Sequence, residues 1–193
     1  MDSAPLRTVL RVAKALEVSG LAYAVGGSIA SGIYGEARAT FDVDILVDLP
    51  AWRVGALAAA LGSGFDVDQA ALLRAAREGT SYSVIDRETG IKVDLFVRGD
   101  RLLDSSQLDR RRAIALGEGG QTTAFTSPED VVLRKLDWLR LSGGVLERQW
   151  RDVLGVLKVQ RQRLDLVYLR ETARRLGLSE TLERALTESG LCA

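Results

Sequence analysis

Apolar side chains follow a helical spacing near the N-terminus and then change to shorter, strand-like patterns. The segment from Leu6 to Leu16 repeats apolar residues at helical intervals, and Gly20 follows it as a C-terminal cap. Beyond it, up to about residue 125, short apolar or alternating runs predict strands interleaved with short helices. The predicted strands are 21–25, 41–47, 81–85, 91–97, 113–116 and 122–125, and the predicted helices are 28–34 and 52–61.

Turn-forming residues join two pairs of these strands. Residues 86–90 connect 81–85 to 91–97, and residues 117–120 connect 113–116 to 122–125. Asp, Thr and Gly favour the backbone conformations of tight turns, so both pairs are predicted as hairpins.

The pattern becomes helical after residue 126. Ser127-Pro128-Glu129-Asp130 is typical of a helix start, with Ser as N-cap, Pro at the first helical position and acids in the first turn. Helical spacing continues to Glu188 with breaks at 142–144, near Arg163 and at Gly177, which predicts three or four helices. The architecture is therefore predicted as α+β, with a core over 1–126 and a helical subdomain over 127–193 packed on it.

Length and composition indicate an ordinary globular protein. The 193 residues suit one domain, or one domain with a small appendage, and 47% are hydrophobic and 27% charged. No apolar run approaches the ~18 residues of a membrane-spanning helix. The N-terminus lacks the continuous apolar stretch of a signal peptide, so we expect a cytoplasmic protein without membrane association.

The absence of some residue types excludes whole classes of catalysis. The chain has no histidine, which rules out Ser-His-Asp and Cys-His catalysis and every zinc site that contains histidine. The single cysteine, Cys192, is the second-to-last residue and is expected in a frayed tail. Catalysis must therefore use carboxylates, Lys, Arg, hydroxyls or a hard metal ion bound by oxygen.

Paired carboxylates lie on the polar face of the alternating strand 41–47. Asp42 and Asp44 project from the face opposite to the apolar side chains of this strand. In strand 91–97, Lys92 and Asp94 share the polar face, and an adjacent antiparallel strand would bring Asp94 beside the other two carboxylates. Oxygen ligands alone suit Mg²⁺ or Mn²⁺, and three carboxylates can hold two such ions ~3.5–4 Å apart. The alternative is a pair of half-exposed strands with acidic residues facing water.

A glycine-rich turn precedes the predicted helix 28–34. Gly26-Gly27-Ser28 lies between a strand and a helix, where backbone N–H groups, a hydroxyl and a helix N-terminus can bind a phosphate. The motif is neither a dinucleotide-binding fingerprint nor a P-loop. Taken alone it is also compatible with a plain turn.

The three features form one combination: Gly-Gly-Ser, thirteen residues, Asp-x-Asp on a strand, and a later strand carboxylate. This combination resembles the polymerase-β-type nucleotidyltransferase superfamily. Within it, residues 34–44, the helix from Ser127 to Lys135 and Gln149-Trp150-Arg151-Asp152 resemble the AbiEii-like group, minimal bacterial nucleotidyltransferases of which many are toxins of toxin–antitoxin pairs. The resemblance covers residues 21–176 and implies a small mixed β-sheet core flanked by helices and followed by a helical bundle.

The resemblance implies a role for each matching residue. Gly26, Gly27 and Ser28 hold the triphosphate of an NTP, and Lys135 reaches its phosphates. Asp42, Asp44 and Asp94 bind Mg²⁺ or Mn²⁺, and Asp94 also helps to deprotonate the attacking hydroxyl. Two further positions complete the implied site. Arg38 contacts a phosphate or braces the loop, with a plain loop residue as the alternative. Asp152 faces Lys135, with a salt bridge to a neighbouring arginine as the alternative.

The acceptor is inferred from charge. Lys+Arg and Asp+Glu balance at 26 each, but residues 98–175 hold 16 basic and 11 acidic side chains. This surplus suits a polyanion such as RNA, although solvated helix faces also explain it. The charge favours RNA as the acceptor, and the resemblance to the AbiEii-like group implies a tRNA 3′ end as the acceptor, a toxin role and a cognate antitoxin. An antibiotic or protein acceptor, a metal-dependent glycosyltransferase and a non-catalytic nucleotide- or partner-binding module are the alternatives.

Overall fold

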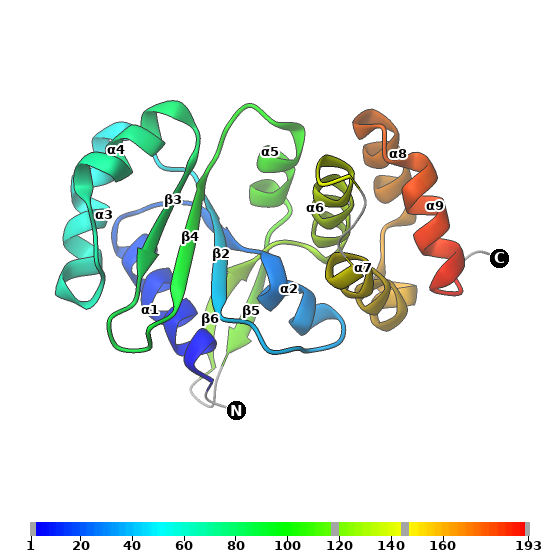
Figure 1. The fold of residues 1–193 in the computed structure, drawn as a ribbon, viewed down its shortest axis with the longest axis horizontal. Coiled ribbons are helices and arrows are strands. Elements are labelled where there is room, and N and C mark those ends of the chain that lie inside the picture. Colours follow the sequence, from blue (N-terminus) through cyan, green and yellow to red (C-terminus); the bar gives the residue numbers. More distant parts are fainter. Residues whose placement is uncertain (1–2, 117–119, 144–146, 192–193) are drawn as a thin grey trace. The chain divides into compact units, whose positions relative to one another are not determined.

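The computed structural model describes residues 3–116, 120–143 and 147–191. The chain divides into two compact units, whose elements Figure 1 shows coloured along the sequence. Unit 1 comprises Met1–Gly26 and Ala39–Thr126, and unit 2 comprises Gly27–Arg38 and Ser127–Ala193. One boundary coincides with the predicted division after residue 126. The structure differs from that prediction in Gly27–Arg38, which groups with the helices of unit 2.

A six-stranded mixed sheet forms the centre of unit 1 in the described residues. Its strands are β1 (Tyr23–Val25), β2 (Asp42–Val47), β3 (Ser81–Ile85), β4 (Lys92–Val97), β5 (Arg112–Leu116) and β6 (Gln121–Phe125). They lie in the order β3-β4-β2-β1-β6-β5. The pairs β2–β4 and β1–β6 are parallel and the other neighbours are antiparallel, so both predicted hairpins, β3–β4 and β5–β6, are confirmed. Phe41, which we predicted inside a strand, precedes β2 and is 82% exposed.

Helices cover the sheet of unit 1. They are α1 (Ala4–Val18), α3 (Val54–Leu61), α4 (Gln69–Glu78) and α5 (Leu102–Asp109), with short 3-10 turns at Ala51–Arg53 and Gly62–Gly64. The predicted N-terminal helix is confirmed as α1, which buries its apolar stripe and packs along β1, β2 and β6. The helices α4 and α5 were not predicted from the sequence.

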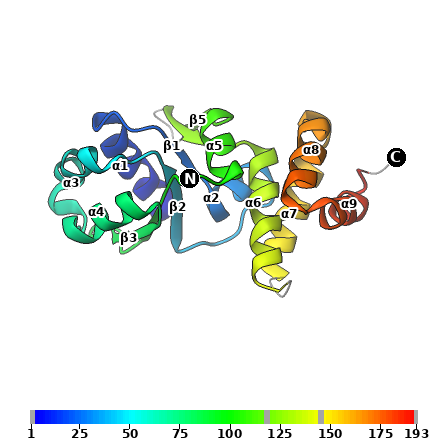
Figure 2. The same cartoon turned by 90° about the horizontal axis from the view of Figure 1, so that it is seen from above.

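Unit 2 is helical in its described part. Its helices are α2 (Gly27–Tyr34), α6 (Pro128–Leu141), α7 (Glu147–Gln160), α8 (Leu166–Leu176) and α9 (Ser179–Glu188), with a 3-10 turn at Arg161–Arg163. The predicted start of α6 is confirmed, because the Ser127 hydroxyl accepts a hydrogen bond from the backbone N–H of Asp130 at 3.2 Å. Figure 2 shows α6 beside α7, and α8 beside α9, in agreement with the packing of these pairs.

Two glycines allow the end of α2 to approach α7 backbone to backbone. A Cβ atom on Gly35 would lie 2.6 Å from the amide nitrogen of Val156, and one on Gly155 would lie 3.3 Å from the amide nitrogen of Glu36. The Gln160 side chain also donates a hydrogen bond to the carbonyl oxygen of Tyr34 at 2.7 Å. These contacts explain why Gly27–Arg38 belongs to unit 2, although it lies between strands in the sequence.

Some sequence predictions lie outside the described residues. They concern residues 117–119 of the turn before β6, Gly144 of the break after α6, and Cys192. Within the described residues, no helix combines the length and the hydropathy needed to cross a membrane.

Candidate active site

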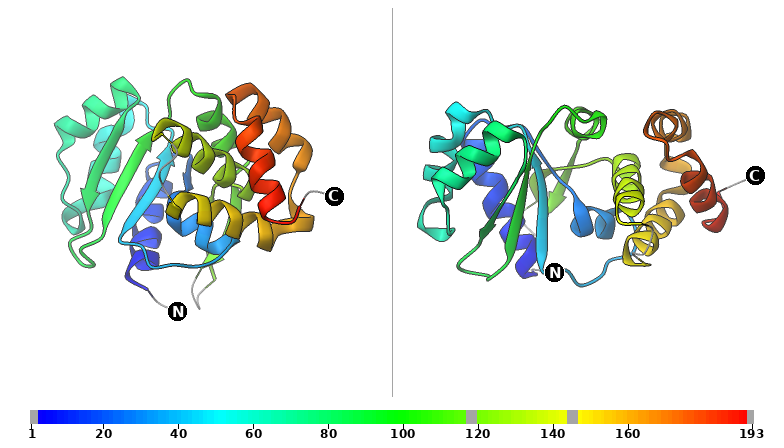
Figure 3. Two further views of the ribbon diagram at one scale, coloured as in Figure 1. Left: turned by 45° about the vertical axis from the view of Figure 1, so that its right-hand side comes forward. Right: turned by 45° about the horizontal axis from the view of Figure 1, so that its top comes forward.

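The three carboxylates that the sequence predicts as metal ligands share one face of the sheet in unit 1. The parallel register of β2 and β4 sets Asp44 beside Asp94 and Asp42 beside Lys92. Side chains of directly paired residues project to the same side, and residues two apart on one strand do so as well. Figure 3 shows β2 and β4 running side by side in both of its views. Asp42, Asp44 and Asp94 are therefore neighbours on one face.

The predicted antiparallel arrangement of these two strands is wrong. The antiparallel partner of β4 is β3, joined to it by the hairpin, whereas β2 is antiparallel to β1. Between β2 and β4 the chain passes through α3, α4 and β3, a connection long enough for a parallel crossover. The alternation along each strand still determines on which face of the sheet a side chain lies. The strand direction is therefore corrected, while Asp42, Asp44 and Asp94 remain on one face.

Hydroxyl groups and one ammonium group bind these carboxylates. Thr40 Oγ1 donates a hydrogen bond to Asp42 Oδ1 at 2.5 Å, and Ser83 Oγ donates one to Asp94 Oδ1. Lys92 Nζ lies 2.7 Å from Asp94 Oδ2. Asp94 is thus engaged through both of its oxygens. Sequence reasoning placed Lys92 on this face but gave it no role.

Lys92 lies in the electrostatic field of all three carboxylates. The hydrogen bond to Asp94 raises the pKa of the Lys92 ammonium above its ordinary value, and a smaller effect of desolvation opposes it. The charges of Asp94, Asp42 and Asp44 also raise this pKa. The acidic face therefore has a positive group of its own.

The donor chemistry of this face fits a hard divalent cation. Its carboxylates and hydroxyls supply only oxygen, the ligand type that Mg²⁺ and Mn²⁺ prefer. Among the described residues, no three His, Cys, Asp or Glu side chains stand close enough together to hold a metal ion. The metal site at Asp42, Asp44 and Asp94 therefore stays a prediction.

The acidic face becomes apolar toward the carboxyl ends of β2 and β4. Leu46 follows Asp44 on the same face, and it packs in a small cluster with Ala24, Phe96 and Leu108 of α5. Because α5 covers this end, Leu46 is 7% exposed, whereas Asp42 and Asp44 at the other end are half-buried. The face thus combines an apolar anchor for α5 with an acidic surface that solutes can reach.

The predicted phosphate-binding turn spans the position in the sequence where unit 1 gives way to unit 2. Gly26 follows β1, and its N–H donates a hydrogen bond to the carbonyl oxygen of Asp44 at 2.8 Å. Gly27 begins α2 with a φ of +57°, a left-handed conformation that favours glycine. A side chain at Gly27 would strain the backbone, whereas a Cβ atom at Gly26 would meet Thr126 Oγ1 at an ordinary 3.6 Å.

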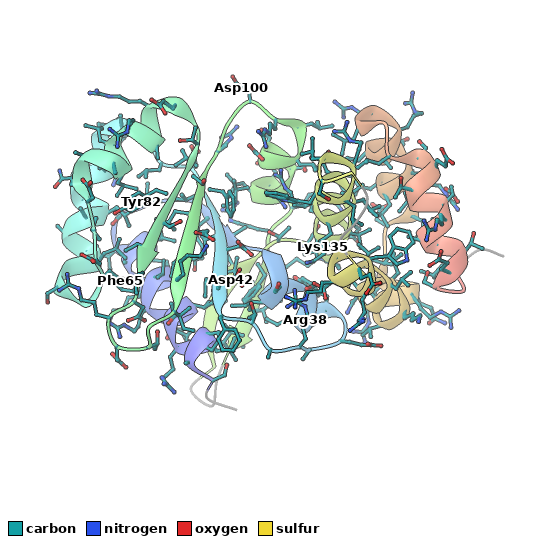
Figure 4. All side chains as sticks on the ribbon, viewed as in Figure 1. Arg38, Asp42, Phe65, Tyr82, Asp100 and Lys135 are labelled. Carbon is teal, nitrogen blue, oxygen red and sulfur yellow. The ribbon has the colours of Figure 1, made fainter. Side chains whose placement is uncertain are left out.

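Four residues of the predicted site are linked by hydrogen bonds in unit 2. The Arg38 guanidinium binds the Asp152 carboxylate with Nε–Oδ1 at 3.0 Å and Nη2–Oδ2 at 3.1 Å, and its Nη2 donates to the Ser28 hydroxyl at 2.5 Å. Lys135 Nζ donates to Asp152 Oδ2 at 2.8 Å and to Gln149 Oε1 at 2.7 Å. Figure 4 labels Arg38 and Lys135, the two cations that share Asp152.

Two cations, Arg38 and Lys135, share the Asp152 carboxylate. Lys135 and Asp152 are 4% and 6% exposed, so water screens their interaction weakly. Burial raises the pKa of the Asp152 carboxyl, but hydrogen bonds from Arg38 and Lys135 outweigh it and bring the pKa below its ordinary value. Through Ser28 the network reaches the N-terminal turn of α2, where the helix dipole adds partial positive charge.

The network shows which partners Arg38 and Asp152 have in this structure. Asp152 pairs with Arg38 and Lys135, whereas Arg148 and Arg151 project from the exposed face of α7. Arg38 braces the segment after α2 by joining Ser28 to Asp152. Gln149 belongs to the same network and had no predicted role. Which of these groups bind a nucleotide stays a prediction.

No family model and no curated protein matches this sequence. Several solved structures match over most of the chain, two of them with a TM-score above 0.5. An antigenic nucleotidyltransferase-like protein from Paracoccidioides brasiliensis is 20% identical, with a TM-score of 0.56 over 97% of this chain and 94% of that one. The chain has a nucleotidyltransferase-like fold. The antibiotic-resistance factor ANT(2'')-Ia is 13% identical, with a TM-score of 0.53 over 95% of this chain and 98% of that one.

These comparisons confirm the predicted α+β fold class. At 20% and 13% identity the likeness concerns the fold, because one fold hosts many functions. The finer resemblance to AbiEii-like toxins is not confirmed by them.

Proposed function

We propose that this protein is a metal-dependent nucleotidyltransferase, which transfers a nucleoside monophosphate from an NTP to an acceptor hydroxyl and releases pyrophosphate. The observation that carries the proposal is the register that sets Asp42, Asp44 and Asp94 on one face of the sheet. The nucleotidyltransferase-like fold supports it, because the residues that resemble the superfamily motifs occur in a chain of that fold.

The proposed reaction is an in-line displacement at the α-phosphorus of the NTP. The acceptor oxygen forms a bond to this phosphorus while the bond to the pyrophosphate oxygen breaks. Asp42, Asp44 and Asp94 would hold a Mg²⁺ or Mn²⁺ ion, which would supply positive charge for the phosphate and the leaving group. Asp94 accepts the proton of the attacking hydroxyl, so no histidine is required.

The proposal assigns the triphosphate to Gly27, Ser28 and Lys135. Two observations support this assignment. The hydroxyl of Ser28 stands at the N-terminal turn of α2, and two cations, Arg38 and Lys135, belong to the same network. Both features favour an anion. In this account Asp152 and Arg38 position the phosphate-binding groups, and Gln149 holds the Lys135 ammonium.

For the acceptor we propose an RNA 3′ end, in particular that of tRNA, with the protein acting as the toxin of a toxin–antitoxin pair. The surplus of 16 basic over 11 acidic residues in 98–175 supports a polyanionic acceptor. The resemblance to AbiEii-like proteins supplies the toxin role and a cognate antitoxin as partner.

A second candidate is a small-molecule acceptor. It is favoured by the structural similarity to the antibiotic-resistance factor ANT(2'')-Ia over nearly the full length of both chains. Both candidates require the same transfer chemistry, and they differ in the molecule that receives the nucleotide.

One experiment tests the function and separates the acceptors. The protein is incubated with NTPs labelled at the α-phosphorus, Mg²⁺, and either total RNA or a panel of antibiotics. We expect metal-dependent label in acid-precipitable RNA. Label in a small product would replace the RNA proposal by the second candidate. No transfer in either arm would contradict nucleotidyl transfer and favour a non-catalytic binding module.

A further inference from the structure

Lys92 is the positive group built into the acidic face of the sheet. It is the first residue of β4, its Cα is paired with that of Asp42, and its ammonium reaches along its own strand to Asp94. The side chain is 51% exposed and Asp94 is 15% exposed. The ammonium therefore lies at the solvent side of the carboxylates, where a cation from solution would arrive.

Each oxygen of Asp94 already has a partner in this arrangement. Ser83 donates to Oδ1 and Lys92 binds Oδ2. Each carboxylate oxygen has a second lone pair, so a divalent cation can still bind Asp94, but it then lies close to one of these groups. The hydroxyl is neutral and its oxygen can remain close to a metal ion, whereas the ammonium repels a metal ion and must move away.

We propose that Lys92 is an internal counter-ion of the proposed metal site, and that its ammonium moves away from Asp94 when a divalent cation binds there. This proposal rests on the proposed function, because it concerns the same three carboxylates. In the metal-free protein Lys92 neutralises part of the repulsion among them. During metal binding it becomes a competitor, so it sets the metal concentration at which the site fills. Lys92 is thus a positioning residue that acts through Asp94.

The same two strands provide a matched control. Arg98 follows β4 and binds Asp48, which follows β2, with Nη1–Oδ2 at 3.2 Å and side-chain exposures of 41% and 48%. This pair is also a half-exposed ion pair between a basic residue and an aspartate. It lies six residues farther along, roughly 20 Å from Lys92 at about 3.3 Å per residue, beyond the Debye length of ordinary buffers.

The test measures the affinity of the full chain for Mn²⁺ by calorimetry, without nucleotide and at about 0.1 M ionic strength, where the Debye length is about 10 Å. Lys92→Met removes the charge and keeps an apolar stem, so it should bind Mn²⁺ about ten-fold more tightly than wild type. Lys92→Arg keeps a cation, so its affinity for Mn²⁺ should stay within about two-fold of wild type. The affinity of Arg98→Met should also stay within about two-fold, because Arg98 is distant from the site. Thermal melts of each variant show that it is folded.

The outcomes separate the inference from the proposed function. Tighter binding by Lys92→Met alone supports the inference. Equal or weaker binding by Lys92→Met, with wild type binding Mn²⁺ and transferring nucleotide, overturns the inference and leaves the function intact. An equal gain in Arg98→Met also overturns it, because the effect would then be one of general charge. No Mn²⁺ binding and no transfer by any variant overturns the proposed function together with the inference.

Discussion

Asp152 is a buried carboxylate shared by Arg38 and Lys135, and its removal takes this partner from both cations. Asp152→Ala removes the carboxylate 2.8 Å from the Lys135 ammonium, which is 4% exposed. Breaking a buried ion pair by removing one partner typically costs about 3–5 kcal/mol, so we expect a loss of that order in the free energy of unfolding. Lys135→Met, which removes a cation and keeps the Arg38 pair, should cost less. Denaturant titration measures both, and an Asp152→Ala loss under about 1 kcal/mol would contradict the network.

The lowered pKa of Asp152 predicts the pH dependence of stability. Because the folded-state pKa lies below its ordinary value of 3.8, the contribution of Asp152 is complete above that value. It is lost as the pH falls through the folded-state pKa. The difference in unfolding free energy between wild type and Asp152→Asn should therefore be constant near neutral pH and shrink toward about pH 3. A difference that grows on acidification would show that the sign is wrong.

Replacing Asp44 should affect activity without lowering the stability of the protein. Asp44 stands beside Asp94 in the register and two residues from Asp42, so the three like charges repel one another. Asp44→Asn should melt at or above the wild-type temperature in metal-free buffer, with a gain of about 0.2–1 kcal/mol. Calorimetric melts in a chelator measure this gain. A strongly destabilised variant would assign Asp44 a structural role.

At the scale of the elements, the contact of α2 with α7 depends on Gly35. A methyl group there would come within 2.7 Å of two backbone atoms of Gly155 and Val156, which no side-chain movement can relieve. We expect Gly35→Ala to cost about 1–3 kcal/mol or more through overpacking. Gly55→Ala is the control, because that glycine lies inside α3 with Gln69 Nε2 at 3.7 Å as its nearest neighbour. It should stabilise the protein by up to about 1 kcal/mol. Equal effects of the two substitutions would contradict the close approach.

The hydrophobic pattern of each element predicted on which face its side chains lie. It was less successful in predicting which strands are neighbours and in which direction they run. The alternation along β2 correctly set Asp42 and Asp44 apart from the buried Val43 and Ile45, because a period of two is a local property. The direction of β4 relative to β2 is decided by the connection between them, which no local pattern contains. The pairing of Arg38 with Asp152 spans 114 positions and needs the packing of α2 on α7. Spacing alone could not predict it.

The two helices that sequence analysis missed have different causes. The helix α4 carries recognisable signals, since Asp68 caps its N-terminus through the N–H groups of Ala70 and Ala71 and Gly79 ends it with a φ of +61°. These signals could have been found. The helix α5 buries Asp104 and Gln107 together with Leu103 and Leu108, so it lacks the apolar stripe by which a helix is recognised. Its position depends on the apolar end of the sheet face.

At the scale of the whole molecule, the net charge is zero, yet some exposed basic residues lie where they do not stabilise the fold. Arg148 and Arg151 are exposed in the first turns of α7, where positive charge opposes the helix dipole. Replacing both by Gln should leave the melting temperature unchanged or slightly higher. If the acceptor is RNA, the variant should bind RNA more weakly and lower the salt slope of log K by about 1.4, at about 0.7 per lost phosphate contact.

The control for this prediction is the double change Arg74→Gln and Arg77→Gln. These residues are exposed on α4 with the same spacing and the same loss of charge. Binding to a labelled RNA is measured across a salt series for all three proteins. An unchanged slope in the α7 variant, or an equal change in both variants, would contradict a specific RNA surface on α7.

The central claim is that the carboxylates on the sheet face carry metal-dependent nucleotidyl transfer. The most direct measurement compares wild type, Asp44→Asn and Asp48→Asn for release of pyrophosphate and transfer of label from an NTP labelled at the α-phosphorus, with Mg²⁺ and with a chelator. Asp48 projects from the same face beyond β2 and pairs with Arg98, so it matches the change in charge. We predict transfer by wild type and Asp48→Asn that requires metal, and a loss of roughly a hundred-fold or more in Asp44→Asn. Equal transfer by Asp44→Asn and Asp48→Asn, or transfer that persists in the chelator, would contradict the account.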